Sequence, residues 1–310
     1  MGFLPIPRRA FLTRLKHRWG KLPGNLRGIL WSLASGAGYT IMIALIKIAG
    51  QTIHITEILL FRQSLMLIIV SPVILRSFPD ALKSSRIDLQ LVRVVCAISA
   101  MLMGFTAAIH LPLADVTTIG FAKAFFVTIG AIFILSEVVG IRRWLAIIVG
   151  FVGVIIVAQP SGGGAISIYG LMAIAGSGFA GITSVIIRKL SQTDRPVTIL
   201  SYQAICVGLF MIPPAIWFWK TPSNEELVLL IAIGVLSAIT QFTNILAYRA
   251  GEATVIAPLE YVRLLYATII GFLVFSDWPG VNVFAGAAII ILAAFYTVRR
   301  EAKKVKVPRQ

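Results

Sequence analysis

Ten long runs of apolar residues follow one another along the chain, separated by short polar stretches. Their approximate bounds are 26–49, 56–75, 89–110, 113–135, 143–159, 167–188, 197–219, 226–248, 253–276 and 280–298. A helix needs about 20 residues to cross the hydrocarbon core of a bilayer, which most of these runs supply. Only helices and closed barrels satisfy every backbone polar group in lipid, and barrel strands are shorter and alternate in polarity. The pattern therefore predicts an all-α membrane protein with ten transmembrane helices.

Composition excludes an ordinary water-soluble domain. Hydrophobic residues make up 58% of the chain and charged residues 13%, with a mean hydropathy of +0.92, whereas soluble domains carry about 25% charged residues. The formal net charge of +16 alone would suit a nucleic-acid-binding protein. The basic residues, however, lie at the ends of the apolar runs and between them, where they meet anionic lipid headgroups. We therefore expect contact with a bilayer and none with nucleic acid.

Lys and Arg are divided unequally between the two sides of a ten-span chain. Twenty-two of the 28 fall on one side, two fall on the other, and four lie within the runs. Because cytoplasmic loops are enriched in Lys and Arg, the richer side is predicted to be the cytoplasm, with both termini there. Residues 1–25 then form a basic N-terminal segment without the pattern of a signal peptide, and residues 300–310 form a basic tail.

The two halves of the chain share short matches in the same order. The matched pairs are Gly28-Ile29-Leu30 with Gly170-Leu171-Met172, Arg62-Gln63 with Tyr202-Gln203, Leu113-Ala114-Asp115 with Ala250-Gly251-Glu252, and Ser136-Glu137 with Ser276-Asp277. Each half has five runs, and an odd number of spans forces the second copy upside down, as in many secondary transporters. The chain is therefore predicted to consist of two inverted five-helix repeats, 26–159 and 167–299.

Several of these motifs carry a family resemblance that covers about residues 26–299. They are Leu111-Pro112-Leu113-Ala114-Asp115, Ser136-Glu137, Gly150-Phe151-Val152-Gly153-Val154, Gly251-Glu252-Ala253, Ala257-Pro258-Leu259-Glu260-Tyr261 and Ser276-Asp277. The chain resembles the drug/metabolite transporter (DMT) superfamily, in its bacterial EamA-type branch of ten-helix carriers. This resemblance implies a central cavity mainly between helices 1–4 and 6–9, a bacterial inner membrane, and movement of small organic solutes without nucleotide hydrolysis.

The fourth helix departs from the family pattern. It has Lys123-Ala124 where many relatives have a small polar residue followed by proline. We therefore expect this helix to lack the family's backbone irregularity and to carry a charge in its place.

Three ionisable residues are predicted to lie near the middle of the membrane. Lys123 is about ten residues into the fourth run, and Arg263 is about ten residues into the ninth. A charge at this depth costs at least about 2.5 kcal/mol, so it normally faces a cavity or a partner. Glu260 precedes Arg263 by three residues and shares its helical face. Either the charges of Glu260 and Arg263 simply neutralise each other, or the two residues form, together with Lys123, the floor of a substrate cavity that favours an anionic or zwitterionic solute.

Two other basic residues within the runs have alternative explanations. Arg62 either lines a substrate pathway or pairs with Glu57 or with lipid headgroups. Arg93 lies near the inner end of the third run, and we expect it to snorkel toward that surface.

Further candidates are polar or aromatic. Asn244 and Gln241 are costly to bury in lipid and are candidates for substrate binding. Tyr39, Tyr202 and Tyr261 either line the site or belong to the core.

Candidates for proton coupling are Glu260, Asp115 and His110. For the last two, which lie at the outer end of helices 3 and 4, simple solvation of a loop is the alternative.

The sequence contains no Walker loop, dinucleotide fingerprint, zinc motif or nucleophile elbow. We therefore expect no enzyme activity, cofactor or metal.

Together these features predict a secondary active transporter that moves a small anionic or zwitterionic metabolite, such as an amino acid, by alternating access. The driving force is either a proton gradient or the gradient of the solute itself. We expect a monomer or a weak homodimer in the bilayer. The alternative is a membrane-embedded enzyme or a lipid-handling scaffold that carries no solute.

Overall fold

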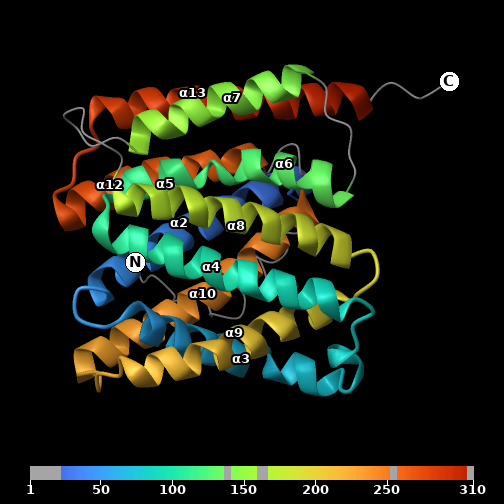
Figure 1. Cartoon of the computed structure of the whole chain (residues 1–310), viewed down its shortest axis with the longest axis vertical. Helices are drawn as coiled ribbons and strands as arrows, with labels where there is room; N and C mark the ends of the chain where they lie inside the picture. Colours follow the sequence, from blue (N-terminus) through green and yellow to red (C-terminus); the bar gives the residue numbers. More distant parts are fainter. Residues whose placement is uncertain (1–21, 136–140, 159–166, 252–256, 306–310) are drawn as a thin grey trace, which may run out of the picture.

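The computed structural model describes residues 22–135, 141–158, 167–251 and 257–305, and within these ranges it consists of helices and loops without a strand (Figure 1). The elements are α2 (Gly24–Ala49), α3 (Ile55–Arg76), η1 (Asp80–Leu82), α4 (Ile87–His110), α5 (Leu113–Gly120), α6 (Lys123–Leu135), α7 (Ile141–Ala158), α8 (Ile168–Leu190), α9 (Pro196–Trp217), α10 (Asn224–Ala250), η2 (Ala257–Val262), α12 (Arg263–Phe275) and α13 (Val281–Val305). The prediction of an all-helical protein is confirmed.

Several helices are long and apolar enough to cross a membrane. In the described parts of the chain there are seven such spans, with α5 and α6 together counted as one. Shorter apolar helices cover Ile147–Ala158 in α7 and Val281–Ala293 in α13. The chain is therefore a multi-pass membrane protein, and a total of ten spans stays a prediction.

The helices pack in pairs that each join an early and a late part of the sequence. Helix α2 lies against α10, α4 against α8, α3 against α9, and α7 against α13. In Figure 1, α7 and α13 form one edge of the bundle, α3 and α9 form the opposite edge, and the remaining helices lie between them. The two halves of the sequence are therefore interleaved, and neither half buries its apolar surface without the other.

The fourth predicted span contains a break, which contradicts the expectation of a regular helix there. Helix α5 ends at Gly120 and α6 begins at Lys123. The amides of Phe121 and Ala122 bond to carbonyls three residues back, at 3.1 and 2.9 Å, as in a tight 3₁₀ turn. Ala122 is fully buried, and the Phe121 ring meets Tyr261 edge-on, with centroids 4.8 Å apart. The prediction was wrong because packing interrupts the helix without a proline.

The ninth predicted span is also divided. The short 3₁₀ segment η2 leads directly into α12 at Arg263. Lys123 and Arg263 are therefore each the first residue of a half-helix.

Helices α4 and α8 approach each other closely at a pair of glycines. A Cβ atom added to Gly176 would lie 3.0 Å from the backbone nitrogen of Gly104 and 3.2 Å from its Cα. A Cβ added to Gly104 would meet nothing within 4 Å. The contact therefore requires a glycine at position 176 but not at position 104.

Polar contacts connect the two halves at one end of the bundle through Asp194, which lies in the connection between α8 and α9. Its carboxylate accepts hydrogen bonds from the Ser84 hydroxyl, from the Ser85 amide and hydroxyl at 3.1 and 2.8 Å, and from Gln90 Nε2 at 2.9 Å. Burial by itself raises the pKa of Asp194, but these hydrogen bonds outweigh that effect and lower the pKa to about 2.

A different contact connects the halves at the opposite end, where α2 ends. Lys47 Nζ donates to Asp277 Oδ2 at 2.9 Å and to the Leu111 carbonyl at 3.0 Å. The Lys47 side chain is only 12% exposed, so the ion pair is partly shielded from water. Both ends of the bundle are thus joined by contacts between early and late residues.

We predict that Gly176→Ala lowers the melting temperature of the detergent-solubilised protein, because an added methyl group must push α4 and α8 apart. Overpacking of this kind costs about 1–3 kcal/mol. Gly104→Ala is the matched control and should leave the melting temperature unchanged or slightly higher, since alanine favours a helix over glycine. Equal melting temperatures for both variants and the wild type would refute the close approach.

We predict that Asp194→Asn flattens the pH dependence of stability at acidic pH. A carboxyl whose folded pKa is depressed from about 3.9 to about 2 stabilises the fold by about 2–3 kcal/mol above pH 4, and this stabilisation is lost as the pH falls to about 2. The variant should therefore have a lower free energy of unfolding at neutral pH, measured by denaturant titration in mixed micelles.

The matched control for Asp194→Asn is Asp80→Asn. Asp80 forms an exposed ion pair with Lys83 at 2.8 Å, and pairs of this kind contribute little. If the two asparagine variants lose the same stability, the Asp194 contacts do not have the role assigned to them.

Candidate functional site

Lys123, Glu260 and Arg263 meet inside the bundle. Arg263 Nη2 lies 4.0 Å from Glu260 Oε1, at the outer limit of an ion pair, and the Glu260 side chain is 41% exposed. Lys123 lies within range of the charges of both residues. The structure therefore brings together two cations and one carboxylate that are only loosely paired.

The guanidinium of Arg263 faces α2. Its Cζ lies 4.8 Å from the centre of the Tyr39 ring, in a cation–π contact. The Nε atom of Arg263 is buried and has no hydrogen-bond partner within the described ranges. A buried donor without an acceptor costs about 1–3 kcal/mol, so an acceptor supplied by a bound molecule would stabilise this site.

Arg62 is a third cation in the interior of the bundle. Its Nη1 donates to Gln63 Oε1 at 2.9 Å, and its Cζ lies 5.6 Å from the centre of the Phe105 ring. Its Nε is buried without a partner in the part of the chain that the structure describes. Arg62 does not pair with Glu57, because five residues along α3 place the two side chains on different faces.

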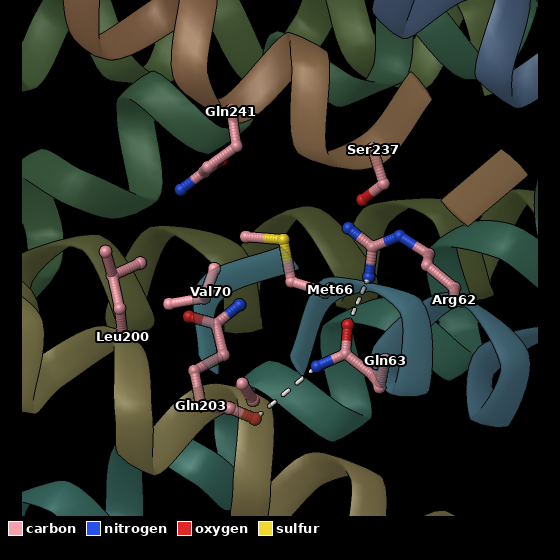
Figure 2. A pocket seen from close by; sticks show the side chains of 9 residues that line it. Arg62, Gln63, Met66, Val70, Leu200, Gln203, Ser237 and Gln241 are labelled. Carbon is pink, nitrogen blue, oxygen red and sulfur yellow. Dashed lines mark hydrogen bonds between the residues drawn. The ribbon is translucent and has the colours of Figure 1, made fainter. Parts of the chain in front are cut away.

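A small cavity lies beside Arg62, between α3, α9 and α10 (Figure 2). Its lining residues are Arg62, Gln63, Met66, Val70, Leu200, Gln203, Ala204, Ser237 and Gln241. Its volume of about 30 Å³ is enough for one or two water molecules. An organic molecule would enter only after the surrounding helices move apart.

A series of hydrogen bonds leads from this cavity to Asp194. Gln63 Nε2 donates to the backbone carbonyl of Gln203 at 3.4 Å, and the Gln203 side chain accepts at Oε1 from Arg93 Nη1 at 3.0 Å. Arg93 Nε donates to Gln90 Oε1 at 3.2 Å, and Gln90 donates in turn to Asp194. The pairing of Gln63 with Gln203 in the two halves was the sequence signal that could have identified this chain of contacts.

The expectation that Arg93 snorkels to the surface is wrong. Its side chain is 0% exposed. Besides Gln90 and Gln203, the guanidinium donates to the Ile199 carbonyl at 3.0 Å. Because each of its three nitrogen atoms has an acceptor, the charge is held inside the bundle.

The remaining predicted site residues fall into two groups. Gln241 lines the cavity, Asn244 follows it one turn later on α10, and Tyr261 packs on Phe121. Tyr202 instead points toward η1, where its hydroxyl donates to the Leu82 carbonyl at 3.2 Å. Tyr202 therefore contacts the Asp194 end of the bundle and not the charged cluster.

His110 and Asp115 lie near the Lys47 end. His110 stacks on Tyr169 with centroids 3.9 Å apart and contacts the Thr106 carbonyl. Asp115 is in the first turn of α5, where the charges of Lys47 and Asp277 act on it. Neither residue is among the contacts of the cluster around Lys123. Glu137, matched in the sequence to Asp277, lies outside the described residues.

Comparisons with known proteins agree with a transport role. The model of the EamA-like transporter family matches residues 167–299. Over 283 residues the chain is 29% identical to the S-adenosylmethionine uptake transporter of Rickettsia prowazekii, covering 90% of this chain and 95% of that protein. It is 26% identical to a riboflavin transporter of Vibrio cholerae, with 90% and 95% covered. It is 28% identical to the pseudopaline exporter CntI of Pseudomonas aeruginosa, with 86% and 94% covered.

A solved crystal structure shares the fold. The two chains superpose with a TM-score of 0.62 at 13% sequence identity, covering 92% of this chain and 99% of the other. Because these relatives are named as transporters and match along nearly their whole length, the protein is a transporter of a small-molecule solute and not an enzyme. These matches support an EamA-type transporter of the drug/metabolite transporter superfamily.

Proposed function

We propose that this protein is a secondary active transporter that moves a small anionic or zwitterionic organic metabolite across the bacterial inner membrane by alternating access. The observation that carries the proposal is the group of incompletely paired cations in the interior. Lys123 and Arg263 share a single carboxylate, that of Glu260, and Arg62 is a further interior cation whose Nε has no acceptor among the described residues. Both chain termini are assigned to the cytoplasm from the distribution of Lys and Arg.

Helix pairing supports two inverted five-helix repeats, residues 26–159 and 167–299. The first helix of the early half pairs with the third of the late half, α2 with α10, and the converse pair is α4 with α8. A two-fold relation between the halves requires this exchange of partners. Under this two-fold relation Lys123 and Arg263 would be equivalent, since each lies at the start of a half-helix.

The chemistry of the cluster favours a carboxylate or phosphate group on the solute. Lys123 and Arg263 each bring a full positive charge, and charged hydrogen bonds to a carboxylate or phosphate are strong. Transporters of several folds present interrupted helices to their substrates. Glu260 would pair with an ammonium group, so a zwitterion also fits.

Alternating access is supported by the contacts that join the two ends. Asp194 connects the halves at one end, and the pair of Lys47 with Asp277 connects them at the other. The cavity beside Arg62 is too small for an organic solute. Transport would therefore require these end contacts to break in turn.

Ligand binding is tested by thermal unfolding of the purified protein against organic anions and zwitterions, with S-adenosylmethionine and riboflavin included because relatives are named for them. A ligand that binds the folded state raises the melting temperature by mass action. We expect stabilisation by compounds that bear a carboxylate or phosphate, and flux of the same compounds in proteoliposomes. Stabilisation only by uncharged compounds would contradict the proposed solute class.

We predict that Lys123→Gln and Arg263→Gln each weaken binding of the stabilising anion about 10- to 100-fold, because each removes a charged hydrogen-bond donor worth about 1.5–3 kcal/mol. Isothermal titration measures the change. Lys83→Gln, an exposed lysine in the connection between η1 and α4, is the matched control and should bind normally. Unchanged affinity in both cluster variants would place the site elsewhere.

We predict that Tyr39 contributes through the face of its ring. Tyr39→Phe keeps the contact with Arg263 and should retain affinity, whereas Tyr39→Ala should lose about 0.5–2 kcal/mol of binding energy through loss of the cation–π contact. If the phenylalanine variant loses as much affinity as the alanine variant, the hydroxyl and not the ring is the group that matters.

A further inference from the structure

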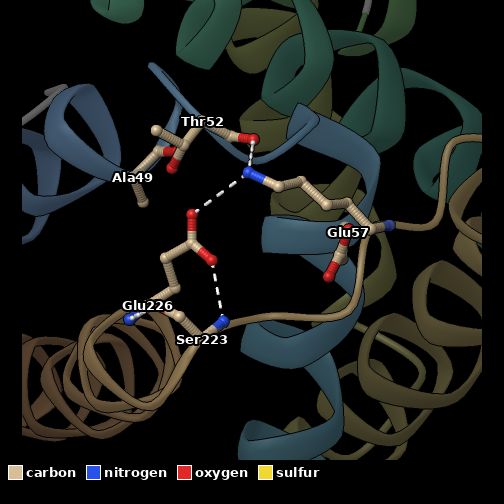
Figure 3. A network of polar contacts seen from close by, with 6 residues as sticks. Ala49, Thr52, Glu57, Ser223 and Glu226 are labelled. Carbon is tan, nitrogen blue, oxygen red and sulfur yellow. Dashed lines mark hydrogen bonds and ion pairs between the residues drawn. The ribbon is translucent and has the colours of Figure 1, made fainter.

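Glu57 is a buried carboxylate that the proposed solute site does not use. It lies in the first turn of α3 and is 0% exposed. One oxygen, Oε2, accepts the backbone N–H of Lys220 at 3.3 Å. The other, Oε1, is buried without a hydrogen-bond partner among the residues described. The position of Glu57 beside the connection between α9 and α10 is visible in Figure 3.

The lysine nearest to Glu57 is bound to other groups. Lys220 Nζ lies 3.5 Å from Glu226 Oε1 and donates to the Thr52 carbonyl at 3.3 Å. Glu226 belongs to the capping box of α10, where Oε2 accepts the Ser223 amide at 2.8 Å. Two carboxylates therefore share one ammonium group, and in this structure the ammonium lies on Glu226.

The electrostatic surroundings of Glu57 suit the neutral acid in this arrangement. The charged groups that face it are Lys220, from the connection between α9 and α10, and Glu226, from α10. On its own element, His54 caps the start of α3 and stacks on Phe218. An ionised carboxylate with one bare oxygen in a buried position is strongly destabilised unless a cation reaches it.

We propose that Glu57 is a proton-binding site of the transport cycle, and that Lys220 exchanges between Glu226 and Glu57 as the proton binds and leaves. This inference rests on the proposed transport function. When Glu57 holds its proton, Lys220 binds Glu226 and Thr52. When the proton leaves for water at this end of the protein, the Lys220 ammonium keeps all its protons and moves to the new Glu57 carboxylate.

The charge change in this exchange equals the one proton that leaves, and no isolated ion remains deep in the protein. Loss of one proton changes the sum of the three groups from zero to minus one. The excess charge then lies on Glu226, which tolerates it because it occupies the first turn of α10, where the helix dipole and the Ser223 amide stabilise an anion. The same movement breaks the contact of Lys220 with the Thr52 carbonyl, so the connection between α9 and α10 is released from the loop that follows α2.

The proton on Glu57 is tested by infrared difference spectroscopy of the full chain in nanodiscs during steps of pH. We expect a carbonyl stretching band of an un-ionised carboxyl at neutral pH that disappears at alkaline pH. Glu57→Gln should remove this band, whereas Glu226→Gln, the matched control on the other carboxylate, should retain it. Lys220→Met should make the band persist to a higher pH, because the cation that stabilises the ionised form is gone.

The released connection is tested by hydrogen exchange of the amides in residues 50–54 and 218–223, with all proteins compared at the same pH. Glu57→Gln should keep exchange slow at alkaline pH, and wild type should exchange faster there. A band that survives Glu57→Gln, or an equal exchange rate in these two proteins, would overturn the proposal. Neither measurement requires a solute, so a missing transport activity would refute the proposed function without deciding the proton site.

Discussion

The cost of placing ionic side chains in a medium of low polarity governs this structure. An unpaired charge or a donor without an acceptor inside a membrane protein is unfavourable by several kcal/mol. The interior arginines of the bundle differ in how completely they are paired. Arg93 is fully buried, and each of its nitrogen atoms has an acceptor. Arg62 and Arg263 each retain a buried Nε without an acceptor among the described residues.

This contrast separates structural charges from those available for binding. The fold satisfies Arg93 with acceptors from α4 and α9, so the same scaffold is capable of satisfying an interior arginine fully. At Arg263 the partner carboxylate is 4.0 Å away and 41% exposed. In the proposed site, a solute with an acceptor group would complete the pairing of Arg263.

Sequence patterns predicted much of the fold because long apolar runs require helices in lipid. They also predicted that Glu260 and Arg263 lie close together, since three residues separate them on one helical face, and the predicted equivalence of the halves added Lys123 to this proposed cluster. They did not predict the break at Phe121 and Ala122, which follows from packing on Tyr261 and has no proline to mark it. They also missed the burial of Arg93, because two of its three acceptors lie on α9, more than 100 residues away. The sequence neighbours of Glu57 likewise do not reveal its environment, because its hydrogen-bond donor is Lys220, far away in the sequence.

The most direct measurement is an experimental structure of the full chain bound to a carboxylate or phosphate compound identified by ligand-induced stabilisation. We predict that the anionic group lies within hydrogen-bond distance of Lys123 and Arg263, with the remaining atoms of the ligand toward Tyr39 and Arg62. A ligand bound outside the bundle, or one whose anionic group contacts none of these cations while they stay sealed from water, would contradict it.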